Sequence, residues 1–203
     1  MNIKHQIART ISLLFHPLLI PTLGFLLLMN SSFYFALLTF QAKKYVLLVV
    51  FLSTFLLPLV SIGILTMNPR FDRSMDKNTD RIVPMLFSAI FYYMGYYYLG
   101  RIPIYPVYRV FLISSVLTII ILLIITLRWK ISAHMAGIGG LIGAIIALSL
   151  RLGINSSLLL AGLIGVAGLV GSSRLLLGKH NPLQIYVGFF LGFAVNYLVL
   201  NYI

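Results

Sequence analysis

The sequence predicts an all-α membrane protein, a polytopic bundle of six or seven transmembrane helices. Of its 203 residues, 61% are hydrophobic and only 9% are charged, whereas a water-soluble globule carries about 25% charged residues. Apolar runs of about 20 residues, the length that crosses about 30 Å of hydrocarbon, recur along the whole chain. We therefore expect a single integral membrane domain over residues 1–203.

The expected helices follow from the apolar segments, which cover residues 11–30, 45–66, 84–100, 107–127, 135–150, 157–172 and 185–202. The first segment contains His16, Pro17 and Pro21. Because proline removes a helical hydrogen bond, we expect a kinked or re-entrant element there. Glycines recur every three or four positions in 135–150 and 157–172, a spacing that lets membrane helices approach closely.

The amino-acid composition limits the kinds of ligand and partner that the protein is expected to bind. The chain has no cysteine, which excludes disulfides and thiolate metal sites. Its formal charge is +12, but the basic residues are spread over short loops with no recognition helix, so nucleic acid is not expected. The lipid bilayer and an anionic, phosphorylated lipid are the expected partners. The first apolar run is not followed by the small-residue pattern of a cleavage site, so we expect no cleaved signal peptide.

Polar residues gather in three clusters: 68–84, 128–134 and 172–184. The first cluster holds all the acidic residues, Asp72, Asp76 and Asp80. Two apolar segments separate the first cluster from the second, and two more separate the second from the third. An even number of crossings returns the chain to the same side, so we expect the three clusters to share one membrane face. Polar groups are costly in a membrane, and their collection at one face indicates a functional site.

The chemistry of the three clusters predicts a site for a phosphate-like anion. Arginine binds phosphate oxygens in a bidentate manner and lysine adds a point charge. Two histidines come from different segments, so one can attack phosphorus while the other protonates the leaving oxygen. The cations are Lys77, Arg81, Arg174 and either Lys179 or Lys130, and the histidines are His134 and His180.

The third cluster contains a spaced set of residues: Ser173 and Arg174, five residues, His180, three residues, and then Gln184. A glycine-bearing apolar segment follows. This spacing resembles the third motif of the type-2 phosphatidic acid phosphatase superfamily, membrane enzymes that remove phosphate from lipid phosphates and diphosphates. In that family the last position is Asp. The resemblance covers about residues 70–200, which we expect to form a phosphatase-like core.

The other two motifs of the family are matched less closely. Its second motif, Pro-Ser-Gly-His, corresponds to residues 131–134, where Ser132 and His134 are kept and Ala133 replaces the glycine. Its first motif, a lysine followed by Arg-Pro, is echoed by Lys77 and Arg81. The third motif is therefore the specific part of the resemblance.

The resemblance implies a phosphatase that acts through a phosphohistidine, without a metal or another cofactor. His180 would be the nucleophile, His134 the general acid, and Arg174 a catalytic cation that stabilises the charge of the transition state. Gln184 would orient the nucleophile by accepting a hydrogen bond from its far ring nitrogen. Lys77, Arg81, Ser132, Ser173 and Lys179 would bind the phosphate.

Two alternatives stay open. Gln184 carries no negative charge, and replacing the buried aspartate of a serine-protease triad by its amide lowers turnover about 10⁴-fold. A weak or inactive family member that binds lipid phosphates or membrane partners is therefore the competing hypothesis. Asn68, Asp72 and Asp76 also resemble the first aspartate-rich motif of membrane-bound aromatic prenyltransferases, which holds Mg²⁺. That family needs a second such motif, and the chain has no further acidic residues outside 72–80.

The sequence also bears on location. We expect an integral protein of the bacterial cytoplasmic membrane. The distribution of lysine and arginine favours neither face once the phosphate-binding cations are set aside. The resemblance implies that the site faces outward, to the periplasm.

Overall fold

A computed structural model describes residues 3–31, 38–67 and 79–202 of the chain, and within these ranges the regular structure is helical. Six helical stretches are long and apolar enough to cross a membrane, which confirms the predicted fold class of a polytopic helical membrane protein. The six candidate spans in the described residues are Phe40–Leu65, Thr79–Leu99, Pro106–Thr126, Ala133–Leu152, Ser157–Leu176 and Pro182–Tyr202.

The first predicted segment, 11–30, is not one continuous helix. Helix α1 (Ile3–Leu14) ends before His16 and Pro17, and α2 (Ile20–Met29) begins after them. Each is too short to cross about 30 Å of hydrocarbon, which takes about 20 helical residues. The break follows from proline, whose ring prevents the preceding residue from continuing a helix. The expectation of a kinked element is thus correct.

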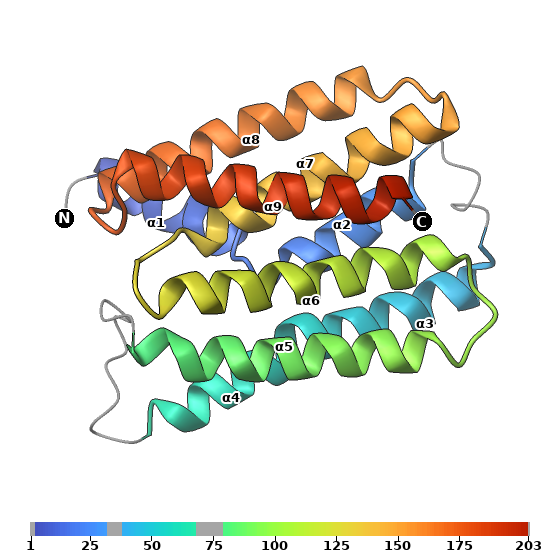
Figure 1. The fold of residues 1–203 in the computed structure, drawn as a ribbon, viewed down its shortest axis with the longest axis horizontal. Helices are drawn as coiled ribbons and strands as arrows, with labels where there is room; N and C mark the ends of the chain where they lie inside the picture. Colours follow the sequence, from blue (N-terminus) through green and yellow to red (C-terminus); the bar gives the residue numbers. More distant parts are fainter. Residues whose placement is uncertain (1–2, 32–37, 68–78, 203) are drawn as a thin grey trace. The chain divides into compact units, whose positions relative to one another are not determined.

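The chain forms two compact units, described here one at a time. The first unit consists of Met1–Ile20 with Lys130–Ile203, and the second of Pro21–Trp129. The first unit contains α1, α7 (Ala133–Leu152), α8 (Ser157–Leu176) and α9 (Pro182–Tyr202), with α1 packed on α8 and α9 lying along α7 (Figure 1).

Glycines bring α7 and α9 into backbone contact. Gly139 and Gly143 of α7 lie against the carbonyl oxygens of Phe189 and Phe193 of α9, and Gly192 of α9 lies against the carbonyl oxygen of Ala136. Any Cβ at these glycines would overlap the neighbouring backbone. Small residues four apart allow this approach of membrane helices. The predicted role of the glycines in 135–150 is therefore confirmed.

The glycines of α8 behave differently. Gly162, Gly165 and Gly168 have no described atom within 4 Å of a Cβ built on them, and only Gly171 contacts neighbouring side chains, those of Ile185 and Met135. Close packing at these three glycines was expected from their spacing and is not found among the described residues. Their spacing alone does not decide which face of α8 meets another helix.

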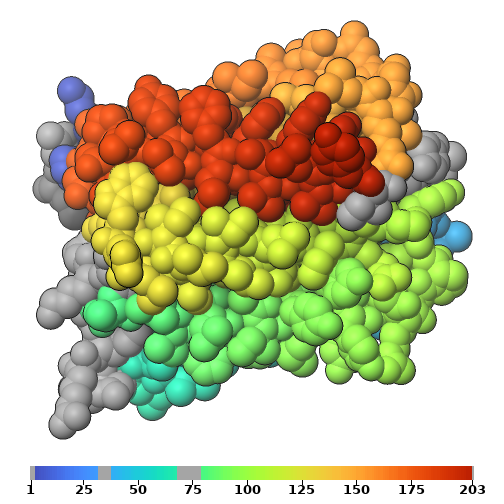
Figure 2. All heavy atoms as spheres, viewed as in Figure 1, coloured from blue at the N-terminus to red at the C-terminus, as the bar shows by residue number. Residues whose placement is uncertain are grey.

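The outer side of α9 carries large apolar and aromatic side chains. Tyr186, Phe190 and Leu198 are exposed, and Figure 2 shows α9 in red along the side of the first unit that is turned toward the viewer. Exposed apolar residues on a long helix suit contact with lipid. The glycine-bearing face of the same helix packs on α7. Helix α9 therefore has one face suited to lipid and one face buried against α7.

The second unit contains α2, one span made of α3 (Phe40–Phe51), η2 (Leu52–Leu56) and α4 (Leu57–Leu65), and the antiparallel pair α5 (Thr79–Leu99) and α6 (Pro106–Thr126) (Figure 1). The span starts five residues before the predicted segment because the Thr39 side chain caps it, accepting from the Ala42 backbone N–H at 3.3 Å. The π-helical turn η2 lies just before Pro58, which has no N–H to donate to Thr54 four residues earlier.

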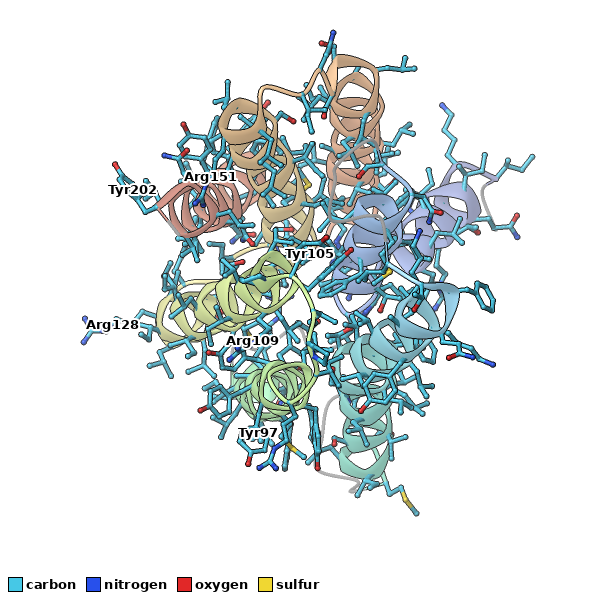
Figure 3. All side chains as sticks on the ribbon, turned by 90° about the vertical axis from the view of Figure 1, so that its right-hand side faces the viewer. Tyr97, Tyr105, Arg109, Arg128, Arg151 and Tyr202 are labelled. Carbon is cyan, nitrogen blue, oxygen red and sulfur yellow. The ribbon has the colours of Figure 1, made fainter. Side chains whose placement is uncertain are left out.

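Two arginines of the second unit lie near the loop between α5 and α6: Arg101 follows α5, and Arg109, labelled in Figure 3, lies in the first turn of α6. Arg109 stacks on the ring of Tyr96 and Arg101 on that of Tyr97, with 5.1 and 4.8 Å from guanidinium carbon to ring centroid. Gly100 leaves room for the Arg109 guanidinium, since a Cβ there would be 3.0 Å from Nη2. Tyrosine and arginine at helix ends are typical of the membrane interface.

Candidate functional site

The turn before α9 is built around the side chain of Gln184. Its amide oxygen accepts from the backbone N–H of Asn181 at 3.2 Å, and the Asn181 side chain accepts from the backbone N–H of Gln184 at 2.9 Å. This reciprocal pair is a capping box, in which the first and fourth residues of the helix start satisfy each other's N–H groups. Pro182 occupies the next position, where a missing N–H costs nothing. The glutamine therefore has a local structural role.

The same oxygen of Gln184 also contacts the nucleophile candidate. It lies 3.2 Å from Nδ1 of His180, as the four-residue spacing predicts. A backbone N–H can only donate, so the oxygen and not the amide nitrogen of Gln184 must face Asn181. That oxygen can accept but not donate, and Nδ1 of His180 must therefore carry the proton. In the neutral ring Nε2 is then the unprotonated nitrogen, the one with a lone pair for attack.

His180 is held in a protected position, with 7% of its surface exposed. It follows a left-handed Gly178, whose φ of 63° suits glycine. The bonds from Gln184 and the enclosing residues limit the rotation of its ring. A nucleophile that is already oriented saves the ordering cost of reaction.

The second and third polar clusters meet at the starts of α7 and α9, as parity predicts. The backbone N–H of Ser132 donates to the carbonyl oxygen of Gln184 at 3.3 Å. Gly188 of α9 lies against the backbone of Ser132, and a Cβ at Gly188 would be 2.6 Å from the backbone carbonyl oxygen of Ser132. The Ser132 hydroxyl caps α7 by accepting from the Met135 N–H at 3.4 Å. Its own proton remains available for donation.

His134 reaches the N-terminal segment of the chain. Its Nε2 lies 3.2 Å from the carbonyl oxygen of Ser12 in α1. A carbonyl only accepts, so Nε2 of His134 carries the proton and Nδ1 of the neutral ring does not. His134 and His180 are therefore held in opposite tautomers.

Arg174 lies in the last turn of α8, where a cation also suits the helix dipole. It interacts electrostatically with both His134 and His16. The neighbouring Ser173 is buried and donates its hydroxyl to the Leu169 carbonyl oxygen at 2.7 Å. The hydroxyl proton of Ser173 is thus used within α8, while the positive charge of Arg174 acts on His134 and His16.

The remaining candidates are placed as follows. Lys179 is half-buried in the turn between α8 and α9, next to His180. Arg81 lies in the first turns of α5, in the second unit. Lys77 falls outside the described residues, as do Asn68, Asp72 and Asp76 of the prenyltransferase-like pattern. Among the described residues, no three histidine or carboxylate side chains gather closely enough to hold a metal ion.

His16 and Ser12 were not among the predicted site residues. The His16 ring packs edge-on against His134, with centroids 5.5 Å apart and an interplanar angle of 77°. The break at Pro17 is the sequence signal that places His16 in an irregular segment. That this segment belongs with α7 and α8 required the tertiary structure.

Comparison with family models, curated proteins and solved structures finds no match for this chain. The arrangement of histidines and arginine in the first unit is therefore the evidence for a function. That geometry joins an oriented histidine with an unprotonated Nε2, an arginine and a second histidine with a proton on Nε2.

Proposed function

We propose that this protein is a membrane phosphatase that removes phosphate from a lipid monophosphate or diphosphate of isoprenoid, glycerolipid or lipid A type. The observation that carries the proposal is the double contact of the Gln184 oxygen. It accepts from Asn181 N–H and from His180 Nδ1, both at 3.2 Å, which leaves the lone pair on Nε2 of His180. A histidine nucleophile in the correct tautomer, in the same unit as an arginine, suits phosphoryl transfer.

In the proposed reaction, Nε2 of His180 attacks phosphorus and forms an N–P bond while the P–O bond to the lipid breaks. Arg174 stabilises the charge on the phosphoryl oxygens. The leaving oxygen takes a proton from His134, in the role that the resemblance implies. Because Nε2–H of His134 faces Ser12, that proton must leave Nδ1 of the imidazolium. Water then attacks phosphorus and gives a proton to Nδ1 of His134, which becomes an imidazolium again. The N–P bond breaks, its electron pair returns to Nε2 of His180, and phosphate leaves.

The proposed function also implies a membrane location and a set of partners. The protein would lie in the bacterial cytoplasmic membrane with its site on the periplasmic face, and its partners would be the bilayer and the phosphorylated lipid. Lys179, next to His180 in the sequence, would add positive charge to the bound phosphate. A phosphate-binding role for Lys77 and Arg81 stays a prediction from the resemblance.

A second candidate function is binding of lipid phosphates without turnover. The observations that favour it are the neutral Gln184, which cannot stabilise a cationic His180 as a carboxylate would, and the engagement of the His134 Nε2 proton by Ser12. The arginine and the oriented histidine would then hold a headgroup instead of cleaving it.

One assay separates these candidates. The purified, detergent-solubilised protein is incubated with a panel of lipid mono- and diphosphates, and released phosphate is measured beside His180→Ala. The phosphatase proposal expects release from at least one lipid, abolished in His180→Ala. Release equal to that of His180→Ala for every lipid, with lipid binding retained, would support the binding function.

A further inference from the structure

His16 lies in the break between α1 and α2 and has a defined hydrogen-bonding state. Its Nδ1 accepts from the backbone N–H of Leu18 at 3.4 Å. A nitrogen that accepts carries no proton, so the neutral ring has its proton on Nε2. His16 therefore offers one N–H donor that its own backbone does not use.

The surroundings of His16 are those of the proposed phosphate site. The ring contacts His134 at a centroid distance of 5.5 Å, and the positive charge of Arg174 acts on it. Burial is the larger cause and Arg174 the smaller cause of a lowered pKa of about 4 for His16. At neutral pH the ring is therefore an uncharged donor under the influence of the Arg174 charge, packed against His134 of α7.

We propose that His16 is a binding residue of this site, and that its Nε2–H donates to the phosphate-type anion held by Arg174. This inference rests on the proposed function for the nature of the ligand. A neutral donor is suited to this place, because it can bind the anion without adding a further positive charge to the one that Arg174 already supplies. The break between α1 and α2 is then part of the binding site.

Two substitutions separate binding from local structure. His16→Asn places an amide oxygen near the former Nδ1 position, so the bond from Leu18 N–H can persist, but its side chain does not reach the Nε2 position. His16→Gln places an amide nitrogen near that Nε2 position and loses the Nδ1 acceptor. A binding role predicts that Gln is the better replacement, and a purely structural role predicts that Asn is. His5→Asn is the matched control, because His5 is exposed on α1.

The readout is calorimetric titration of the full-length protein in detergent with orthovanadate, a tetrahedral oxyanion. We expect His16→Asn to weaken binding about tenfold or more, since a hydrogen bond to a charged group is lost. His16→Gln should stay within about threefold of wild type, and His5→Asn should be unchanged. Equal affinity of His16→Asn and wild type would overturn the inference, and so would tighter binding by His16→Asn than by His16→Gln.

If a variant does not fold, the inference can be tested by NMR on the wild-type protein. In protein labelled with ¹⁵N-histidine, orthovanadate should move the Nε2–H proton resonance of His16 downfield. An unmoved resonance at saturating orthovanadate would contradict the inference.

The inference and the proposed phosphatase function can fail separately. If no lipid phosphate is hydrolysed but orthovanadate binds and His16→Asn weakens that binding, the inference holds without turnover. If lipid phosphate is hydrolysed while His16→Asn binds orthovanadate like wild type, the phosphatase function holds and the inference is wrong. If orthovanadate does not bind the wild-type protein, the inference is wrong as well.

Discussion

Gln184 accepts a hydrogen bond from Nδ1 of His180 at 3.2 Å. The same oxygen completes the capping box of α9, so helix formation and histidine orientation depend on one atom. Glutamine thereby supplies the acceptor without the negative charge that a carboxylate would carry.

Replacing the amide by a carboxylate should raise activity. Gln184→Glu keeps the side-chain length and both acceptor bonds, and adds a negative charge beside an imidazole that becomes cationic as Nε2 forms a bond. Loss of such a charge lowers turnover by up to about 10⁴-fold in a serine protease, so we expect at least a tenfold gain in phosphate release. Gln184→Leu, which lacks the acceptor, should be nearly inactive. A Glu variant slower than wild type would contradict this role of the charge.

The two site histidines should be observed in opposite tautomers. Gln184 requires a proton on Nδ1 of His180, and the Ser12 carbonyl requires one on Nε2 of His134. Long-range ¹⁵N–¹H spectra of ¹⁵N-histidine-labelled protein above pH 7 distinguish the two forms. His134→Ala and His180→Ala assign the signals. Finding His180 protonated at Nε2 would remove the main support for it as nucleophile.

Removing the capping box of α9 should lower phosphate release as well as the stability of the protein. Asn181→Ala removes the acceptor for Gln184 N–H and should lower the free energy of unfolding by about 1 kcal/mol. We also expect slower phosphate release, because the turn that holds His180 loosens. Asn155→Ala is the control, since Asn155 accepts from Ser157 N–H at 2.9 Å in the turn before α8. Its thermal stability should fall by a similar amount with phosphate release unchanged.

The glycine contacts of α7 and α9 should tolerate no side chain. Gly192→Ala forces a methyl group into the Ala136 carbonyl, and we expect a loss of about 1–3 kcal/mol in stability, the usual cost of overpacking. Gly165→Ala on α8 meets nothing within 4 Å among the described residues. It should be neutral or slightly stabilising, because alanine favours helix. Thermal unfolding in detergent measures both, and equal midpoints for the two variants would argue against backbone contact.

Acid should destabilise the protein through His16. Burial, followed by the charge of Arg174, lowers its pKa from the usual 6.5 to about 4. Between these values the unfolded chain binds the proton and the folded chain does not, so stability falls as pH drops from 6.5 toward 4. The difference corresponds to about 3 kcal/mol at most.

Thermal unfolding midpoints across this pH range measure the effect of His16. His16→Asn should flatten part of the profile, while His5→Asn should leave it as in wild type. A His16→Asn profile identical to that of wild type would show that His16 does not contribute.

Several features could be predicted from the sequence because they depend on local or nearly local physics. Hydropathy identified the six spans, and proline identified the break before α2. The motif spacing predicted that Gln184 accepts a hydrogen bond from His180, although His180 lies in the turn before α9. Parity predicted that the second and third polar clusters share a membrane face, and the starts of α7 and α9 are in contact. The capping box was also readable, as Asn181, Pro182 and a glutamine at the fourth position.

Other features depend on which surfaces pack, and spacing does not encode that. The glycines of α7 and α8 have similar spacing, yet Gly139 and Gly143 meet a backbone and Gly162 and Gly165 do not. His16 and His134 are separated by more than a hundred residues, and their ring contact exists because α1 packs in the same unit as α7 and α8. Local chain chemistry therefore specified the helices and the orientation of His180. Long-range packing decided that a third histidine, His16, contacts His134.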